Sequence, residues 1–312
     1  MKRKVIKQGP ATLMVSLPSK WIKKYGIKKG QELEIEEKGG QLILGLKKQI
    51  EVEKTKIHVE NVENFMRRVI HVPYRRGCDE LEVTYSDPKL VQPISESLLE
   101  TIGFEVVKQG NNFLLIKNVA KGVEEEFDVI LDRFFMVIKT MGNNILEALK
   151  SNNSDLLEEV KTMEATAQKL YNFCCRQLYR EGYKDESKTI FLYCIVRALE
   201  RIGDHFNRQS YFLTGEVLYK KLRKKDPIER PKMDKEIAGI FSNVLDMLDF
   251  CYIMVKKFDY KKLLMVRDLE VETRRSISNR TMNKKQKSGE GIFLYYCLST
   301  IEELAHMTEV LF

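Results

Sequence analysis

The chain has 312 residues, 43% of them hydrophobic and 31% charged, and a formal net charge of +8 at pH 7. That length allows two or three domains with cores of their own, and the composition is typical of a globular chain rather than a disordered one. Apolar runs are far shorter than the roughly 20 residues that span a bilayer. Because Met1-Lys2-Arg3-Lys4 is not followed by the apolar stretch of a signal peptide, we expect a cytoplasmic protein without membrane insertion.

The net charge lies at one end of the chain. Residues 1–50 contain twelve basic and four acidic side chains, so the remaining residues are neutral overall. Such an asymmetry indicates a polyanion-binding module joined to an electrically neutral body. The alternative, a solvated basic tail, is less consistent with the regular pattern of strands and turns in which these lysines lie.

Residues 3–46 have the pattern of short strands separated by turns. Four strands and one helix are expected, in the order strand 3–7, strand 13–18, helix 20–25, strand 31–36 and strand 42–44. Ser19 is placed to cap the helix, Gly26 to end it, and Gly39-Gly40 to turn between the last two strands. Fewer than 50 such residues cannot bury a sufficient core, so a second copy of the chain is expected to complete it.

The basic segment also has the features of a known family. They are Arg3-Lys4-Val5, Gly9, the strand ending in Pro18, Trp21 to Ile27, Gly30 and the strand of Leu33 and Ile35. Residues 1–48 thereby resemble the AbrB/MazE/SpoVT swapped-hairpin DNA-binding domain. The resemblance implies a homodimer in which two chains exchange hairpins into one small β-barrel, with basic side chains on the DNA backbone. The matching basic positions are Arg3, Lys4, Lys23 and Lys24. Some relatives are antitoxins that bind a protein toxin, which leaves a protein partner as the alternative.

Residues 49–120 have a mixed pattern that predicts a small α/β connector domain. The expected elements are strands around 52–59 and 81–85, helices around 62–70 and 91–102, and a hairpin over 104–116 that turns at 110–112. No residues in this segment have catalytic spacing. Arg75-Arg76 before Gly77 is interpreted as a solvated turn rather than a phosphate site, and the segment as a rigid connector or a dimer contact.

Residues 121–312 are predicted to be helical. Six helices are expected, at 122–150, 154–182, 187–214, 232–257, 259–285 and 289–311. Phe191-Leu192-Tyr193 recurs as Phe293-Leu294-Tyr295, and the apolar positions that follow recur at the same offset. This indicates two three-helix repeats, 121–226 and 227–312, in an antiparallel bundle.

Acidic residues recur together with the apolar ones. Glu200 and Asp204, one turn apart, match Glu302 and His306, and on the preceding helix Glu164 matches Asp268. Side chains at i and i+4 share one helix face, so pairs from two facing helices could bind iron, manganese or zinc. The alternative is an ordinary salt-bridged face, because Arg197, Arg201 and Arg208 lie three or four residues from the acids.

The segment Leu199 to His205, with Tyr171 and Arg176-Gln177-Leu178 before it, is similar to the PhoU family of phosphate-uptake regulators. The resemblance covers about residues 121–312, strongly in the first repeat and weakly in the second. It implies carboxylates that bind iron or zinc on the bundle surface, and negative regulation of phosphate transport and signalling. The implied metal residues are Glu164, Glu200, Asp204, Asp268, Glu272, Glu302 and His306. Gln168 and His306 replace acids of the family motif, which favours a mononuclear or weak site over a full cluster.

An AbrB-like module joined to a PhoU-like bundle resembles archaeal phosphate-uptake regulators. We therefore expect a cytoplasmic, non-enzymatic regulator that binds DNA through a dimeric N-terminal domain. Its bundle would sense or relay phosphate status through a partner such as a phosphate transporter ATPase or a signalling protein. The alternatives are a metal-dependent enzyme that uses the bundle carboxylates and an antitoxin-like scaffold that binds another protein.

Overall fold

The computed structural model describes residues 2–38, 40–46, 53–60, 66–120, 127–215, 234–283 and 288–311. The chain divides into two compact units, Met1–Val52 and Glu53–Phe312, which are described separately here. Gly39 of the predicted turn, the start of the helix predicted at 122 and the junction of the repeats at 226/227 lie outside the described residues.

The described residues of the first unit form four short strands in two separate antiparallel pairs. In the first pair, β1 (Val5–Gln8) lies against β2 (Thr12–Val15), with Val5 opposite Val15. In the second pair, β3 (Glu34–Lys38) lies against β4 (Gln41–Gly45). The predicted order of strands is confirmed, although β3 begins three residues after the predicted start.

Helix α1 (Ser19–Tyr25) lies between the two pairs. Gly26 ends it as predicted, with a φ of 62° that L side chains rarely adopt, and donates its backbone N–H to the Ile22 carbonyl. The predicted cap is wrong. Ser19 is the first helical residue, and Pro18 occupies the cap position without a side-chain hydrogen bond.

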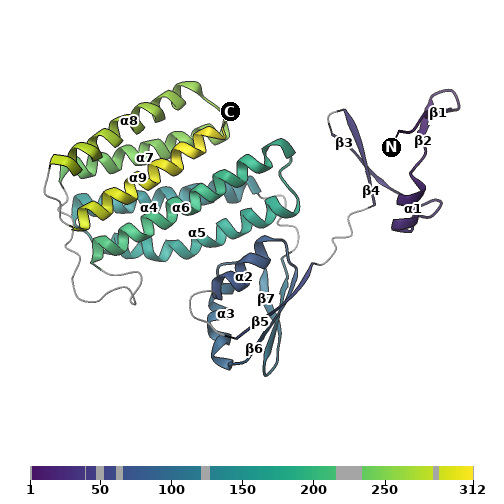
Figure 1. The fold of residues 1–312 in the computed structure, drawn as a ribbon, viewed down its shortest axis with the longest axis horizontal. Coiled ribbons are helices and arrows are strands. Elements are labelled where there is room, and N and C mark those ends of the chain that lie inside the picture. The colour runs from purple at the N-terminus through teal and green to yellow at the C-terminus, as the bar shows by residue number, and fades with distance from the viewer. Residues whose placement is uncertain are drawn as a thin grey trace. The chain divides into compact units, whose positions relative to one another are not determined.

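The second unit begins with an α/β layer. Its elements are β5 (Lys54–Val59), α2 (Met66–Arg75), β6 (Glu80–Tyr85), the 3-10 turn η1 (Pro88–Leu90), α3 (Val91–Leu98), β7 (Phe104–Gln109) and β8 (Phe113–Asn118). The strand order is β5-β6-β8-β7, with β5 parallel to β6 and the other neighbours antiparallel. Alternate residues of β6 are buried, and α2 and α3 share one apolar core with the sheet (Figure 1). Helix α3 ends at Leu98, four residues before the predicted end.

Where the structure describes the rest of the chain, six long helices lie close to the predicted positions. They are α4 (Phe127–Ser151), α5 (Asp155–Arg180), α6 (Thr189–Thr214), α7 (Lys235–Lys256), α8 (Tyr260–Asn283) and α9 (Ser288–Glu309); the 3-10 turn η3 (Glu186–Lys188) precedes α6. The prediction of a strand region, an α/β layer and a helical bundle is therefore confirmed.

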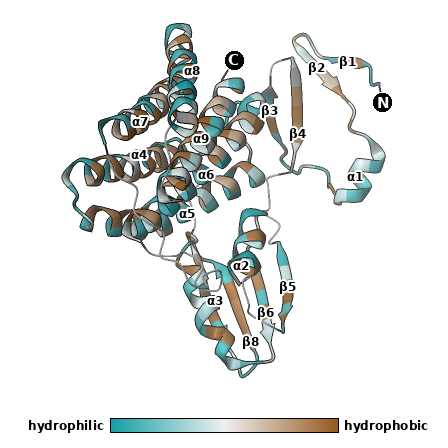
Figure 2. Cartoon of the chain, turned by 60° about the vertical axis from the view of Figure 1, so that its left-hand side comes forward, coloured by the Kyte–Doolittle hydropathy of each residue, from teal (hydrophilic) through white to brown (hydrophobic). Residues whose placement is uncertain are grey.

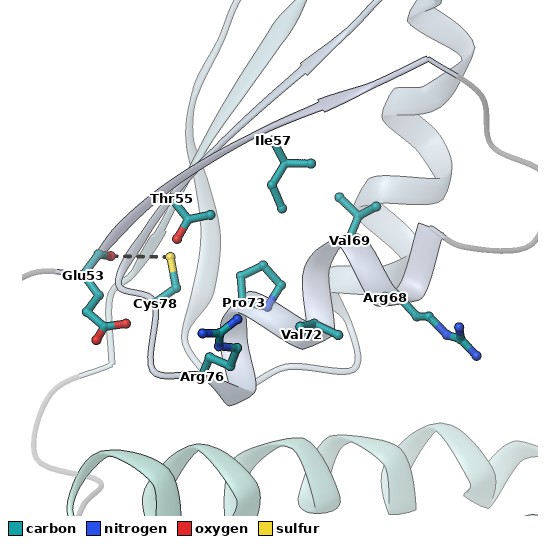
Figure 3. Close-up of a pocket in the computed structure, with 9 residues that line it drawn as sticks. All are labelled: Glu53, Thr55, Ile57, Arg68, Val69, Val72, Pro73, Arg76 and Cys78. Carbon is teal, nitrogen blue, oxygen red and sulfur yellow. Dashed lines mark hydrogen bonds between the residues drawn. The ribbon is translucent and has the colours of Figure 1, made fainter.

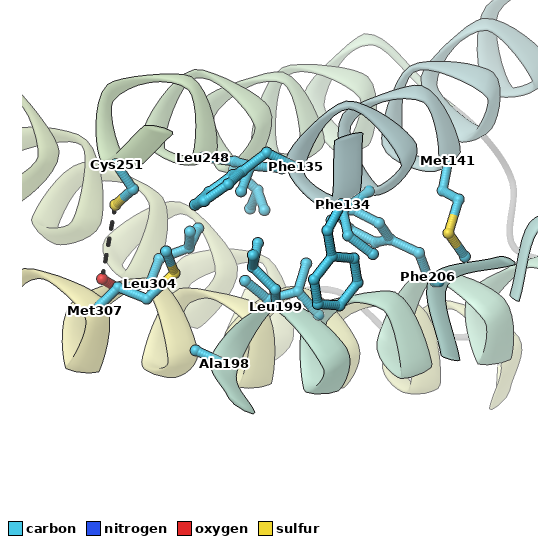
Figure 4. Packing of buried hydrophobic residues seen from close by; sticks show 14 of the residues in the cluster. Phe134, Phe135, Met141, Ala198, Leu199, Phe206, Leu248, Cys251, Leu304 and Met307 are labelled. Atoms are coloured by element: carbon cyan, nitrogen blue, oxygen red, sulfur yellow. Dashed lines mark hydrogen bonds between the residues drawn. The ribbon is translucent and has the colours of Figure 1, made fainter. Parts of the chain in front are cut away.

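The two repeats pack through α4 against α7 and through α6 against α9. Phe134, Leu199, Leu248 and Leu304 meet in the shared core (Figure 4). Gly142 permits the close approach of α4 to α7, because a Cβ atom there would lie 2.4 Å from Cδ2 of Leu245. The bundle therefore has one continuous core rather than one core for each repeat.

Helix α7 is apolar and long enough to cross a membrane by length and composition alone. The sequence prediction was based on uninterrupted apolar residues. It did not identify α7 because charged residues interrupt the apolar sequence of this helix. Ile237, Phe241, Val244 and Leu248 on this helix are buried in the bundle. Its hydropathy is therefore explained by a place in the core.

Candidate functional site

The first unit presents its basic side chains to solvent. Arg3 and Lys4 precede β1, Lys23 and Lys24 form the last turn of α1, and all four are exposed. Lys24 also lies over the ring of Tyr25, with Nζ 5.1 Å from its centroid. Exposed cations on ordered elements can contact a polyanion without first losing internal partners.

The strands of the same unit expose apolar side chains. Val5 is 60% exposed, Leu13 68% and Leu42 68%, and Figure 2 shows hydrophobic residues along β4. Every residue of β1 and β2 is exposed. So many exposed apolar side chains on neighbouring strand residues indicate an interaction surface. The β-barrel expected from sequence is not formed by one chain.

In the first repeat of the bundle, three of the predicted site residues lie together. Glu164 is on α5, and Glu200 and Asp204 are on α6. Burial and the charge of Asp204 raise the pKa of Glu200, while burial, with a further contribution from Glu164, raises that of Asp204. Arg197 lies 3.3 Å from Glu200, and Arg208 lies 3.5 Å from Asp204. The acidic face of the first repeat is therefore crowded and has its own counter-ions.

Helix α2 of the α/β layer adds a further cation. Its Arg67 reaches Glu164 at 3.2 Å and Glu100, which follows α3, at 2.5 Å. Eight residues later, Arg75 stacks over the ring of Tyr171 on α5, 5.2 Å from the centroid. The interpretation of Arg75 as part of a solvated turn is wrong, because Arg75 ends α2 and packs against the bundle.

Two buried titratable groups lie beneath this contact. Burial raises the pKa of Glu100 to about 7, although the charge of Arg67 opposes the rise. His71 Nε2 lies 3.3 Å from the Glu100 carboxylate and 3.1 Å from the carbonyl of Ser97. Burial, together with Arg75 and Arg67, lowers the pKa of His71 to about 4, so the imidazole is neutral at pH 7.

The α/β layer is also fixed to the bundle by a buried ion pair. Arg176 and Arg180 on α5 both reach Oδ1 of Asp79 at 2.5 Å. Arg176 donates further to the carbonyls of Tyr74 and Cys78. Although burial opposes it, the hydrogen bond from Arg180 and the charges of both arginines hold the pKa of Asp79 below its usual value. The end of α2 is thus bonded to α5 through both backbone and side chains.

The matching residues of the second repeat lie in a different setting. Asp268, Glu272, Glu302 and His306 are exposed, and Glu302 has Arg274 at 3.9 Å. Arg274 also binds Glu270 at 3.0 Å, so Glu270 rather than Asp268 or Glu272 shares a cation with Glu302. Arg201 pairs with Glu303 between α6 and α9.

As they lie in the described part of the chain, these side chains do not form a complete metal centre. In the part of the chain that the structure describes, no three His, Cys, Asp or Glu residues gather as a ligand set. In the first repeat the carboxylates face arginines, and in the second they are spread along an exposed surface. Iron or zinc binding stays a prediction.

Sequence reasoning missed Arg67, Glu100, Asp79 and Arg176. Each acts through a partner in another element, and Arg67 and Glu164 are 97 residues apart in sequence. No local spacing signals such pairs. Glu270 had a usable signal, because Arg274 follows it at i+4 on the same helix.

Two family models match the chain. Residues 6–52 match the model described as "Antidote-toxin recognition MazE, bacterial antitoxin", and residues 131–209 match that of the PhoU domain. No curated protein and no solved structure matches the chain. The first match covers the exposed strands and basic helix, and the second covers the helices that carry Glu164, Glu200 and Asp204. The chain therefore combines an N-terminal segment that matches a MazE-type antitoxin model with a helical segment that matches the PhoU domain model.

Proposed function

We propose that the chain is a dimeric, DNA-binding regulator of phosphate transport or phosphate signalling, and not an enzyme. One observation carries this proposal. The whole net charge of +8 lies in the first 50 residues, on the segment that matches the MazE family and exposes Arg3, Lys4, Lys23 and Lys24. An ordered, strongly basic surface is the electrostatic feature on which phosphate-backbone binding depends.

Dimerisation of the first unit is the second part of the proposal. Its hairpins expose apolar side chains such as Ile6, Leu13 and Leu42, and neither two-stranded pair can be stable alone in water. A second copy of the chain would cover these side chains and double the number of cations facing DNA. The predicted β-barrel is the arrangement that this pairing would form.

The bundle is proposed to relay phosphate status to a phosphate transporter ATPase or a signalling protein. The match to the PhoU domain supports the class of process, and the contact between α2 and α5 supports a mechanical connection to the α/β layer. A partner that shifts α5 would act on Arg67, Arg75 and Asp79, and through them on α2.

DNA binding is tested by its dependence on salt. Arg3, Lys4, Lys23 and Lys24 give a dimer eight cations. If all eight contact phosphates, a plot of log K against log salt should approach a slope of about −7. Some of these side chains will not contact a phosphate, so we expect a slope of about −4 or steeper. Lys23→Ala with Lys24→Ala should flatten the slope by up to about 3.6 and weaken binding to all sequences alike.

A matched variant in the bundle distinguishes DNA binding at α1 from a general effect of the net charge. Lys261→Ala with Lys262→Ala on α8 removes the same charge, and should leave the slope unchanged. The proposal fails if this pair flattens the slope as much as the α1 pair, or if the α1 pair retains the wild-type slope.

An antitoxin-like role is the second candidate, and the description of the MazE family favours it. The same exposed apolar strands would then bind a protein toxin. Salt-insensitive, weak DNA binding, together with stable one-to-one complex formation with a co-expressed toxin, would support this candidate over the first.

A further inference from the structure

A groove opens between α2 and the edge strand β5 of the α/β layer (Figure 3). Its volume is about 500 Å³, within the range of small-molecule sites. Ile57 of β5 faces Val69, Val72 and Pro73 of α2 across it, so its middle is aliphatic. Thr55 and Arg76 lie at one end, where the chain leaves α2.

The groove exists because α2 contacts the bundle with one face and borders the groove with the opposite face. Arg67, Tyr74 and Arg75 point to the α5 side, where they bond or stack with the bundle or its neighbours. Val72 and Arg76 lie on the other face and remain exposed. Among the described strands, β5 is at the edge of the sheet, so none of them closes that side.

Charge is unevenly distributed along the groove. Among the described residues, the guanidinium of Arg76 has no hydrogen-bonding or ion-pair partner. The Thr55 hydroxyl lies at the same end, near the buried thiol of Cys78, which donates to the carbonyl of Glu53 at 3.4 Å. The Glu53 side chain also borders this end, but in Figure 3 it extends away from the aliphatic wall. Arg68, at the far end, already has an interaction of its own.

We propose that this groove binds a small aliphatic carboxylate, with its head on Arg76 and its tail between Ile57 and Val72. A guanidinium matches a carboxylate through two parallel hydrogen bonds, and the aliphatic wall rewards each methylene that leaves water. One unpaired arginine beside Glu53 balances a monoanion better than the nearly doubly charged phosphate of an ester. The ligand would hold the end of α2, whose other face carries the bundle contacts, and so act as an effector.

The test is calorimetric titration of the full chain with straight-chain carboxylates from acetate to decanoate. Affinity should rise up to roughly fourfold for each added methylene until the tail passes the groove. Hexan-1-ol, which lacks the charge, should bind roughly tenfold or more weakly than hexanoate.

Two variants locate the site. Arg76→Gln should lower hexanoate affinity by roughly 10- to 100-fold, the effect of losing a charged hydrogen bond. Val72→Asp should abolish binding by placing a negative charge on the exposed aliphatic wall without disturbing the core. Arg275→Gln, an exposed arginine of α8, is the matched control and should bind as wild type does.

Three outcomes would overturn the proposal. These are no heat from any carboxylate, equal affinity of wild type and Arg76→Gln, and binding of inorganic phosphate or hexyl phosphate as tight as that of hexanoate. The last would show that the site recognises phosphate rather than a monoanionic amphiphile.

Discussion

The two repeats of the bundle carry similar acidic spacings, but the α/β layer covers only the first. Glu164 is 16% exposed and bonded to Arg67 of α2, whereas Glu302, in the second repeat, is 59% exposed and has one arginine at 3.9 Å. Burial raises the pKa values of Glu200 and Asp204 in the covered repeat. The same sequence pattern therefore forms an internal contact in the first repeat and an exposed surface in the second.

A buried arginine in each repeat shows the same divergence. Arg176 on α5 is bonded to Asp79 and to backbone carbonyls of the α/β layer. Arg280 on α8 is bonded to Glu290, Asp234 and Glu236 of its own repeat. Arg176 therefore bonds the bundle to the α/β layer, whereas Arg280 bonds to residues within the second repeat.

The largest expected effect follows removal of Asp79. Arg176 has a side chain only 5% exposed, and Asp79→Ala would leave this charge buried without its acidic partner. We expect a loss of about 3 kcal/mol in the free energy of unfolding, because breaking a buried pair costs more than the pair itself contributes. Urea denaturation measures the loss, and hydrogen exchange should show the α2 amides opening first.

Glu236→Gln is the counterpart in the second repeat. Arg280 retains Asp234 and Glu290, and the Glu236 side chain is 43% exposed, so the expected loss is about 1 kcal/mol or less. Equal losses of unfolding free energy in Asp79→Ala and Glu236→Gln would contradict this distinction between Arg176 and Arg280.

The second prediction concerns pH and Glu100. Its pKa is raised from 4.5 to about 7 by burial. Between these values the folded chain holds a proton that the unfolded chain has released, so this group lowers stability as pH rises. Arg67, His71 and Glu164 face the carboxyl group and remain in the variant Glu100→Gln. From pH 5 to 8, this variant should gain up to about 3 kcal/mol relative to wild type.

Urea denaturation of both proteins at four pH values in that range measures the difference. Glu302→Gln, in the open repeat, is the control, and should differ from wild type by no more than about 0.5 kcal/mol at every pH. A constant difference between Glu100→Gln and wild type would rule out titration of Glu100 in this range.

The third prediction, a smaller effect than those of Asp79 and Glu100, concerns metal on the open repeat. Glu302 and His306 lie one turn apart without covering arginines from α2, and imidazole favours zinc or iron over magnesium. Zinc at ten times its dissociation constant should stabilise the chain by about 1.4 kcal/mol. Glu302→Ala and His306→Ala should abolish this gain, and Glu200→Ala should retain it.

Elemental analysis after exposure to zinc, iron and manganese gives an independent measurement. Equal metal in wild type and all three variants would mean that the carboxylates of both repeats form only salt-bridged faces. Loss of metal in Glu200→Ala alone would place the site in the covered repeat instead, against the comparison made above.

Much of the fold was predictable because apolar residues recur at helical spacing over long segments. The boundaries of α5 and α6 lie within two residues of those predicted, and Gly26 ends α1 as expected. The capping rule failed at Ser19, which enters the helix rather than capping it, because Pro18 occupies the extended cap position. The covered site was not predictable, because Arg67 approaches Glu164 only when α2 and α5, which are far apart in the sequence, pack together.

The bonds from Arg176 to the end of α2 also have a consequence for how the chain folds during synthesis. They join residues 98 and 102 positions apart, so the α/β layer leaves the ribosome well before α5. At about 5–20 residues per second, roughly 5 to 20 seconds separate the appearance of Cys78 from that of Arg176. During that interval Asp79 lacks both arginines, and the last turn of α2 lacks its backbone partners. Completion of the layer must therefore wait for a helix of the following domain, which makes the nascent layer dependent on continued translation.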